Sequence, residues 1–131
     1  MAFRDFAGFF ERHRQKVPFT DAHRCFEEFR GVLTADAAGT LSQEAYLSLG
    51  VRQSLFDQAQ RTQLFELFQR YLGWLKDAAL FEPNLIAHAW APKATPRYDF
   101  LAVDEVQDLT PATRCWPCSG CPSTGSQWAP R

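Results

Sequence analysis

The stretch from Tyr98 to Pro111 constrains the fold more than any other part of the sequence. It reads Tyr-Asp-Phe-Leu-Ala-Val-Asp-Glu-Val-Gln-Asp-Leu-Thr-Pro, an apolar run that ends at two adjacent carboxylates, Asp104 and Glu105. A short apolar run bounded by turn signals predicts a strand buried on both faces, as in a parallel sheet. Thr110 has the character of a helix N-cap, with proline at the first helical position. The stretch therefore predicts a strand, an acidic turn at its ligand-binding end and a helix.

The same residues resemble a known motif. Asp-Glu-Val-Gln-Asp-Leu-Thr-Pro, preceded by Tyr-Asp-Phe-Leu-Ala-Val, closely resembles motif II (the Walker B element) of UvrD/Rep-like superfamily 1 DNA helicases. Four apolar residues and an acid are common by chance, but Glu105, Gln107, Asp108 and Pro111 in register make the resemblance specific. The family usually has Pro-x-Gln after the acids, and Thr113 stands where that Gln is expected. The resemblance covers residues 98–111 of 131.

The resemblance implies a role for each polar side chain of the motif. Asp104 matches the residue that helps to hold the Mg²⁺ bridging the β- and γ-phosphates of ATP. Glu105 matches the carboxylate that orients and deprotonates the attacking water. Gln107 would contact the γ-phosphate and that water, and Asp108 would couple nucleotide state to the DNA-binding segments. Without the resemblance, the acids would be interpreted as solvated residues of a turn at a strand end.

The phosphate-binding loop that these roles require is absent from the sequence. Such a loop has the pattern Gly-x-x-x-x-Gly-Lys-Ser/Thr, whose backbone amides cradle the phosphates. The lysines, Lys16, Lys76 and Lys93, follow Gln, Leu and Pro, so no Gly-Lys pair occurs. The sequence therefore predicts a truncated piece from the middle of a helicase, inactive alone. Mg²⁺ and ATP are expected to bind in the intact parent, where hydrolysis would drive DNA unwinding, and not tightly to this chain by itself.

Upstream of the motif, apolar side chains recur at helical spacing. The first two stripes consist of Phe3, Phe6, Phe9, Phe10 and His13, and of Ala22, Cys25, Phe26, Phe29, Val32 and Leu33. A capped helix start is predicted at Thr40, with Gln43 in capping-box register. The longest helix is predicted from about Ser54 to about Ala79. Aromatic stripes at this spacing are far more typical of a core than of a base-stacking surface.

The order of these segments fits the same family. UvrD/Rep-like helicases insert a helical subdomain, called 1B, into the first ATPase domain, and the chain then returns to the sheet at motif II. By this order, residues 1–95 are assigned to a helical region resembling that insertion, and residues 96–113 to the motif II strand and the start of its helix. The predicted fold is mainly α with one β-strand, as a fragment of an α/β P-loop NTPase.

Residues 114–131 differ sharply from the rest, because they are rich in Cys, Trp, Pro, Ser and Gly and have no hydrophobic periodicity. Three cysteines beginning at Cys115 are spaced Cys-x-x-Cys-x-x-Cys, which is a spacing found in zinc and iron–sulfur sites. Three ligands are one short of a closed site, and Cys25 belongs to the predicted helices. We expect a disordered tail that follows a frameshift or gene truncation after about Thr113.

Composition narrows the remaining function classes. The formal net charge is −1, so the chain as a whole does not attract nucleic acid. No run of apolar residues is long enough for a transmembrane helix, and the start lacks a signal-peptide pattern, which predicts a cytoplasmic protein without a membrane partner. Two functions stay open. One is a helicase fragment whose partners are DNA and the missing helicase segments; the other is a helical protein-interaction module without catalytic activity.

Overall fold

The structure is a computed structural model. It describes residues 1–13, 18–93, 95, 102 and 104–114. The elements are α1 (Phe3–His13), α2 (Ala22–Glu28), η2 (Phe29–Leu33), α3 (Gln43–Leu47), α4 (Gln58–Asp77), α5 (Pro83–Trp90), η3 (Ala91–Lys93), η4 (Val106–Asp108) and α6 (Pro111–Arg114). The prediction of a mainly α fold is confirmed. Within the described ranges, no helix has the length and apolar character needed to cross a membrane.

The predicted strand and the α/β architecture gain no support from the described residues, which contain no strand. Of the stretch 98–103 the structure describes only Ala102, so most of the predicted strand lies outside the described residues. A strand needs a neighbour to pair its backbone N–H and C=O groups. The described part of the chain contains no strand that could pair with it.

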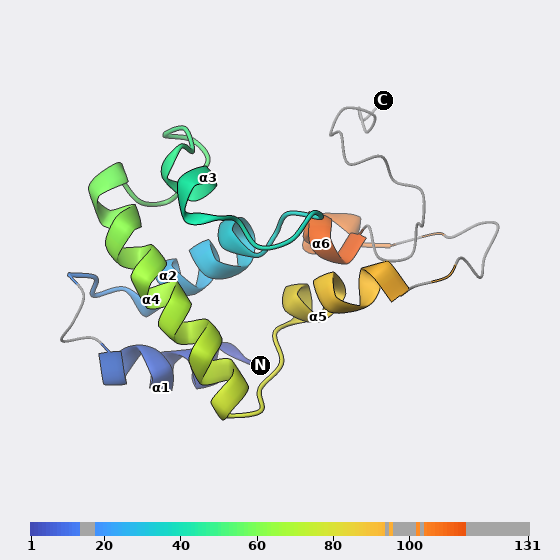
Figure 1. The fold of residues 1–131 in the computed structure, drawn as a ribbon, viewed down its shortest axis with the longest axis horizontal. Helices are drawn as coiled ribbons and strands as arrows, with labels where there is room; N and C mark the ends of the chain where they lie inside the picture. Colours follow the sequence, from blue (N-terminus) through green and yellow to red (C-terminus); the bar gives the residue numbers. More distant parts are fainter. Residues whose placement is uncertain (14–17, 94, 96–101, 103, 115–131) are drawn as a thin grey trace.

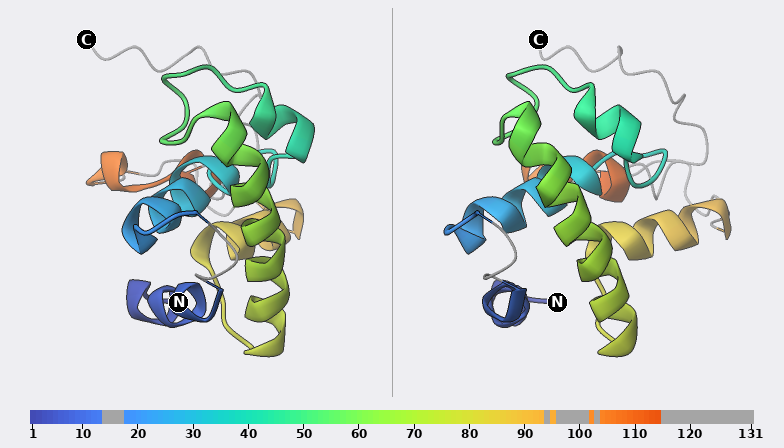
Figure 2. Two further views of the ribbon diagram at one scale, coloured as in Figure 1. Left: turned by 90° about the vertical axis from the view of Figure 1, so that its left-hand side faces the viewer. Right: turned by 60° about the vertical axis from the view of Figure 1, so that its left-hand side comes forward.

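Two groups of helices make up the molecule. In Figures 1 and 2, the long helix α4 crosses α1 and α2, and α3 lies near its first turns. Helices α5 and α6 pack against each other beside this bundle (Figure 1). The segment that carries the motif II acids therefore leads into a helix that is docked on the helical part of the chain.

Side-chain caps explain where the helices begin. Helix α4 starts after Asp57, whose side chain accepts a hydrogen bond from the Gln60 N–H while Gln60 bonds back to the Asp57 amide. The predicted start near Ser54 was too early, because the Ser54 hydroxyl donates to a buried carboxylate instead. The cap of α3 is Ser42 and not Thr40, since the Ser42 hydroxyl accepts from the Ala45 amide at 3.2 Å.

The core is a cluster of aromatic rings contributed by α1, α2, η2, α3 and α4. The Phe29 ring lies 5.1 Å from Phe68, 5.2 Å from Tyr71 and 5.5 Å from Phe6, between ring centroids. These distances fit the edge-to-face and tilted packing that aromatic rings prefer. Fully or almost fully buried aromatic side chains are Phe6, Phe9, Phe10, Phe26, Phe29, Tyr46, Phe68 and Tyr71. The prediction that the aromatic stripes form the core is confirmed.

The second predicted helix changes its hydrogen-bonding register at Phe29. Residues Phe29–Leu33 form a π-helical turn, in which the Thr34 N–H donates to Phe29 O, five residues back, at 3.0 Å. The Thr34 hydroxyl donates to the same oxygen at 2.9 Å. An α-helical register would have directed the Thr34 amide to Arg30 O. Single π turns of this kind are rare and frequently lie at functional sites.

Removal of the Phe29 ring should strongly destabilise the fold. It is 1% exposed, so Phe29→Ala should lower the free energy of unfolding by about 3–5 kcal/mol, through lost burial and a cavity. Phe81 is the matched control, because it is 67% exposed and its change to alanine should cost roughly 0.5 kcal/mol or less. Urea unfolding followed by circular dichroism measures both. Equal losses for the two variants would contradict the assigned core.

Buried acids make the fold sensitive to alkali. Burial, with the Asp21 carboxylate adding to it, raises the pKa of the Cys25 thiol from 9.0 to about 12. Burial likewise raises the pKa of the Tyr46 and Tyr71 hydroxyls. Each group holds its proton more tightly in the folded chain, so its contribution is complete below about pH 9 and is lost as pH rises through the folded pKa. The free energy of unfolding should therefore fall from pH 9 upward.

Urea midpoints at pH 8 and pH 10.5 measure this loss. Tyr71→Phe removes one of the titrating hydroxyls and keeps the ring, so its stability should fall less steeply with pH than that of the unchanged protein. An unfolding free energy that is the same at both pH values in the unchanged protein would show that the three groups are not buried as described.

Candidate functional site

The candidate site is the exposed turn that carries the motif II side chains, which we call the acidic turn (residues 104–108). The side chains of Asp104, Glu105, Gln107 and Asp108 are all exposed. Asp104 Oδ1 accepts from the Glu105 N–H at 2.9 Å, and the Asp108 N–H donates to Glu105 O at 2.9 Å. The Gln107 amide donates to Glu105 Oε2. The structure thus brings together the side chain of Glu105, just before the 3₁₀ turn η4, and that of Gln107 within it, next to Asp104.

Glu105 has a left-handed backbone conformation, with φ of 52°. This region is uncommon for residues other than glycine, asparagine and aspartate, because Cβ approaches the following carbonyl oxygen. Such strain persists only where the surrounding contacts hold it, and it concentrates at functional sites. The residue that the sequence singles out as the general base is therefore also the strained residue of the acidic turn.

The donor set of the turn fits a Mg²⁺ ion that is bound mainly by a nucleotide. Among the residues that the structure describes, no group of three His, Cys, Asp or Glu side chains is placed to hold a metal. Mg²⁺ usually binds through one or two carboxylates, keeps several waters and takes its other ligands from substrate phosphates. Asp104 supplies one such carboxylate. The three tail cysteines considered as metal ligands, Cys115, Cys118 and Cys121, lie outside the described residues.

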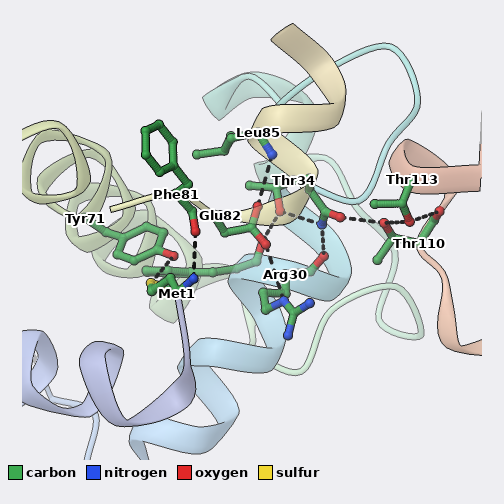
Figure 3. Close-up of polar contacts among 11 residues, drawn as sticks. Met1, Arg30, Thr34, Tyr71, Phe81, Glu82, Leu85, Thr110 and Thr113 are labelled. Atoms are coloured by element: carbon green, nitrogen blue, oxygen red, sulfur yellow. Dashed lines mark hydrogen bonds and ion pairs between the residues drawn. The ribbon is translucent and has the colours of Figure 1, made fainter. Parts of the chain in front are cut away.

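Helix α6 follows the acidic turn and is docked by hydrogen bonds. It begins at Pro111, as the sequence predicted. The Thr110 hydroxyl donates to Asn84 Oδ1 at 2.6 Å, and the Ala112 N–H donates to Ala35 O at 2.9 Å. Figure 3 shows Thr110 beside Thr113, on the side of α5 where Thr34 and Arg30 lie. The threonine expected to cap α6 therefore directs its hydroxyl proton to the helical bundle.

Asn84 is the residue that joins α5, η2 and α6. Its side chain is 1% exposed, and its Nδ2 donates to Arg30 O and to Thr34 Oγ1, each at 3.0 Å. Its Oδ1 accepts from Thr110. Both ends of this buried amide are therefore satisfied by partners far apart in the sequence. The sequence analysis did not single out Asn84, because an asparagine after the proline of a helix start is ordinary.

A buried carboxylate lies next to this junction. Glu82 is 1% exposed and caps α5, because its side chain accepts from the Leu85 N–H at 3.1 Å. Its second oxygen lies 3.3 Å from Arg30 Nε, as an ion pair whose geometry falls short of a hydrogen bond (Figure 3). The carboxylate adds to the effect of burial in raising the pKa of the Tyr71 hydroxyl. Glu82 thus fixes the start of α5, and Asn84 lies in the first turn of that helix.

A second buried carboxylate, Glu28, has a structural role. It is fully buried and accepts from the Tyr46 hydroxyl at 2.8 Å, from the Ser54 hydroxyl and from the Leu55 N–H at 2.9 Å. Arg61 donates to backbone carbonyls of the same segment between α3 and α4. These bonds hold the connection in place, and the carboxylate is fully used in doing so.

Comparisons of the chain with protein-family models, curated proteins and solved structures find no match. The resemblance to helicases accordingly rests on residues 98–111 alone. The structure adds two observations to this resemblance: the hydrogen bonds within the acidic turn and those that dock helix α6.

Proposed function

We propose that this chain is part of an ATP-dependent, UvrD/Rep-like DNA helicase and carries the acid and the general base of its ATPase site. The observation that carries the proposal is the register of Asp104, Glu105, Gln107, Asp108 and Pro111 after an apolar run. The exposed grouping of the first three side chains supports it, as does the helix that starts at Pro111. Residues 1–95 would correspond to the inserted helical subdomain and residues 96–113 to motif II.

The chemistry assigned to the chain is proton transfer and ligand positioning. Asp104 would hold a Mg²⁺ ion, which would supply charge neutralisation for phosphoryl transfer. Gln107 donates its amide to Glu105 Oε2, and the exposed Glu105 carboxylate would keep acceptor sites for the proton of the attacking water. The carboxylate of Glu105, whose backbone is left-handed, is oriented by its bond from Gln107. The nucleotide itself would be held by the phosphate loop of the parent.

One observation favours the alternative function, a helical protein-interaction module. Ile86 and Trp90 lie one turn apart on α5 and are 40% and 56% exposed, and Phe81 just before the helix is 67% exposed. Exposed apolar side chains that gather on one element mark interaction surfaces when they form a contiguous patch. This function needs no nucleotide, so loss of ATPase chemistry separates it from the first.

The decisive variant is Glu105→Gln in the parent protein that contains this chain and a phosphate loop. It should lower kcat for ATP hydrolysis by about 10²–10⁴-fold, because the general base is lost while nucleotide binding is kept. Asp104→Ala should instead weaken Mg²⁺-dependent nucleotide binding. Glu66→Gln is the matched control, because Glu66 is an exposed glutamate on α4, outside the motif. Coupled-enzyme assays of turnover and fluorescence titration with a labelled nucleotide measure the two effects.

Near-normal turnover in the Glu105→Gln parent would reject motif II and leave the interaction module as the better function. The DNA that flanks the coding sequence provides an independent test of the helicase proposal. We expect a Gly-x-x-x-x-Gly-Lys-Thr/Ser segment upstream, and the next helicase motif downstream in another frame. Flanks that encode neither would count against the helicase.

A further inference from the structure

Backbone carbonyls in and after the π turn accept donors from the later helices. We call them the carbonyl platform: Arg30 O, Ala35 O and Asp36 O. Arg30 O accepts from Asn84 Nδ2 at 3.0 Å, and Ala35 O accepts from the Ala112 N–H at 2.9 Å. Asp36 O accepts from His88 Nε2 at 2.8 Å. The last carbonyls of a helix have no partner within it, so donors from other elements satisfy them.

The π register makes one of these carbonyls available. Because the Thr34 N–H donates to Phe29 O, Arg30 O loses the amide that an α-helix would have given it. The Asn84 side-chain amide takes that place, and its second hydrogen meets Thr34 Oγ1. The Thr34 hydroxyl is itself fixed by donating to Phe29 O. The orientation of the Asn84 amide is thereby set, with its oxygen directed to Thr110.

We propose that Asn84 is a positioning residue for the ATPase site, which acts through Thr110 to fix α6 and, with it, the acidic turn against the helical bundle. The inference rests on the proposed function, which it deepens by assigning a role to a residue outside the motif. The connection is short, because Thr110 follows Asp108 by two residues and the Asp108 N–H is bonded to Glu105 O. A displacement of Thr110 therefore moves the turn that carries the general base.

Hydrogen bonds give the docking of α6 its direction, and Ala112 is the buried apolar side chain among the described residues of this helix. Helix α6 has a single turn, and its buried apolar side chain is Ala112, at 3% exposed. Leu109, just before it, remains 37% exposed. A methyl group buries too little surface to hold a helix end against thermal motion. The bonds from Thr110 to Asn84 and from Ala112 to Ala35 are the contacts that fix its place.

The chemistry of the junction requires an amide at position 84. An aspartate there could accept from Thr110 but could not donate, and its second oxygen would face Arg30 O and Thr34 Oγ1. An alanine would remove the donor to Arg30 O and the acceptor for the half-buried Thr110 hydroxyl, which would keep only its contact with Thr113 Oγ1 at 3.1 Å. Asparagine alone presents one acceptor and two donors at this length. This requirement is what makes the assignment testable by single substitutions.

Hydrogen exchange in the full chain, followed by NMR, tests the docking. Thr110→Val keeps the shape of the side chain and removes its hydroxyl, so the Ala112 and Asp108 amides should exchange roughly 3- to 10-fold faster, as expected for one lost hydrogen bond. The Phe68 amide in α4 should be unchanged. Thr110→Ser should restore protection, and Thr62→Val, at an exposed threonine of α4, is the matched control. Unchanged exchange at both Ala112 and Asp108 in Thr110→Val would overturn the inference.

Turnover in the parent protein tests the catalytic consequence. Thr110→Val and Asn84→Ala should each lower kcat more than they raise KM for ATP, because they displace the acidic turn while the phosphate loop of the parent still holds the nucleotide. The double variant should be no slower than the slower single one, since both remove the same link. Thr110→Ser should recover kcat. If Glu105→Gln abolishes turnover while both of these variants keep full kcat, the inference fails alone; if Glu105→Gln has no effect, the proposed function fails with it.

Discussion

The rest of the structure depends on the shift of one hydrogen bond at the end of the second helix. The Thr34 amide bonds Phe29 O and not Arg30 O, and the carbonyl that is left open receives the Asn84 side chain. Aromatic packing of Phe29 against α4 holds the turn on its other side. The turn thus faces a dry aromatic core in one direction and a polar junction in the other. Through this one turn, the bundle places α5 and α6.

The two sides of the π turn contribute to the structure in different ways. The aromatic core contributes stability that is not directional, because the free energy of apolar burial is roughly proportional to the area that is buried. The polar junction fixes the relative positions of η2, α5 and α6, because a hydrogen bond weakens steeply when its angle or length changes. The acidic turn adjoins α6, whose docking includes bonds of this directional kind. Under the proposed function, a general base on that turn would need such placement, because it acts only within hydrogen-bond reach of its water.

The sequence predicted those parts that depend on local pattern. The aromatic stripes gave the helices that form the core, and Thr110-Pro111 gave the start of α6. The predicted starts of α3 and α4 lay a few residues too early, because Ser42 and Asp57 cap these helices in place of nearby residues that can also act as caps. The role of Asn84 could not be predicted, since its side chain bonds Arg30 and Thr34, which lie 54 and 50 residues away in the sequence. The π turn has no sequence signal of its own, because it differs from an α-helix by the acceptor of one amide. The acidic turn was found from its motif alone, and the strained φ of Glu105 is visible only in three dimensions.

The most direct test of this account is an NMR measurement on the Asn84 side-chain amide in the full chain, labelled with ¹⁵N. The two Nδ2 protons should exchange slowly with water and show nuclear Overhauser contacts to the side chains of Thr34 and Thr110, because both ends of the amide are held in a buried site. Contacts to both threonines at once are the predicted result. An amide with the exchange rate of a free asparagine and no contact to Thr110 would contradict the claim that the helical bundle positions the acidic turn.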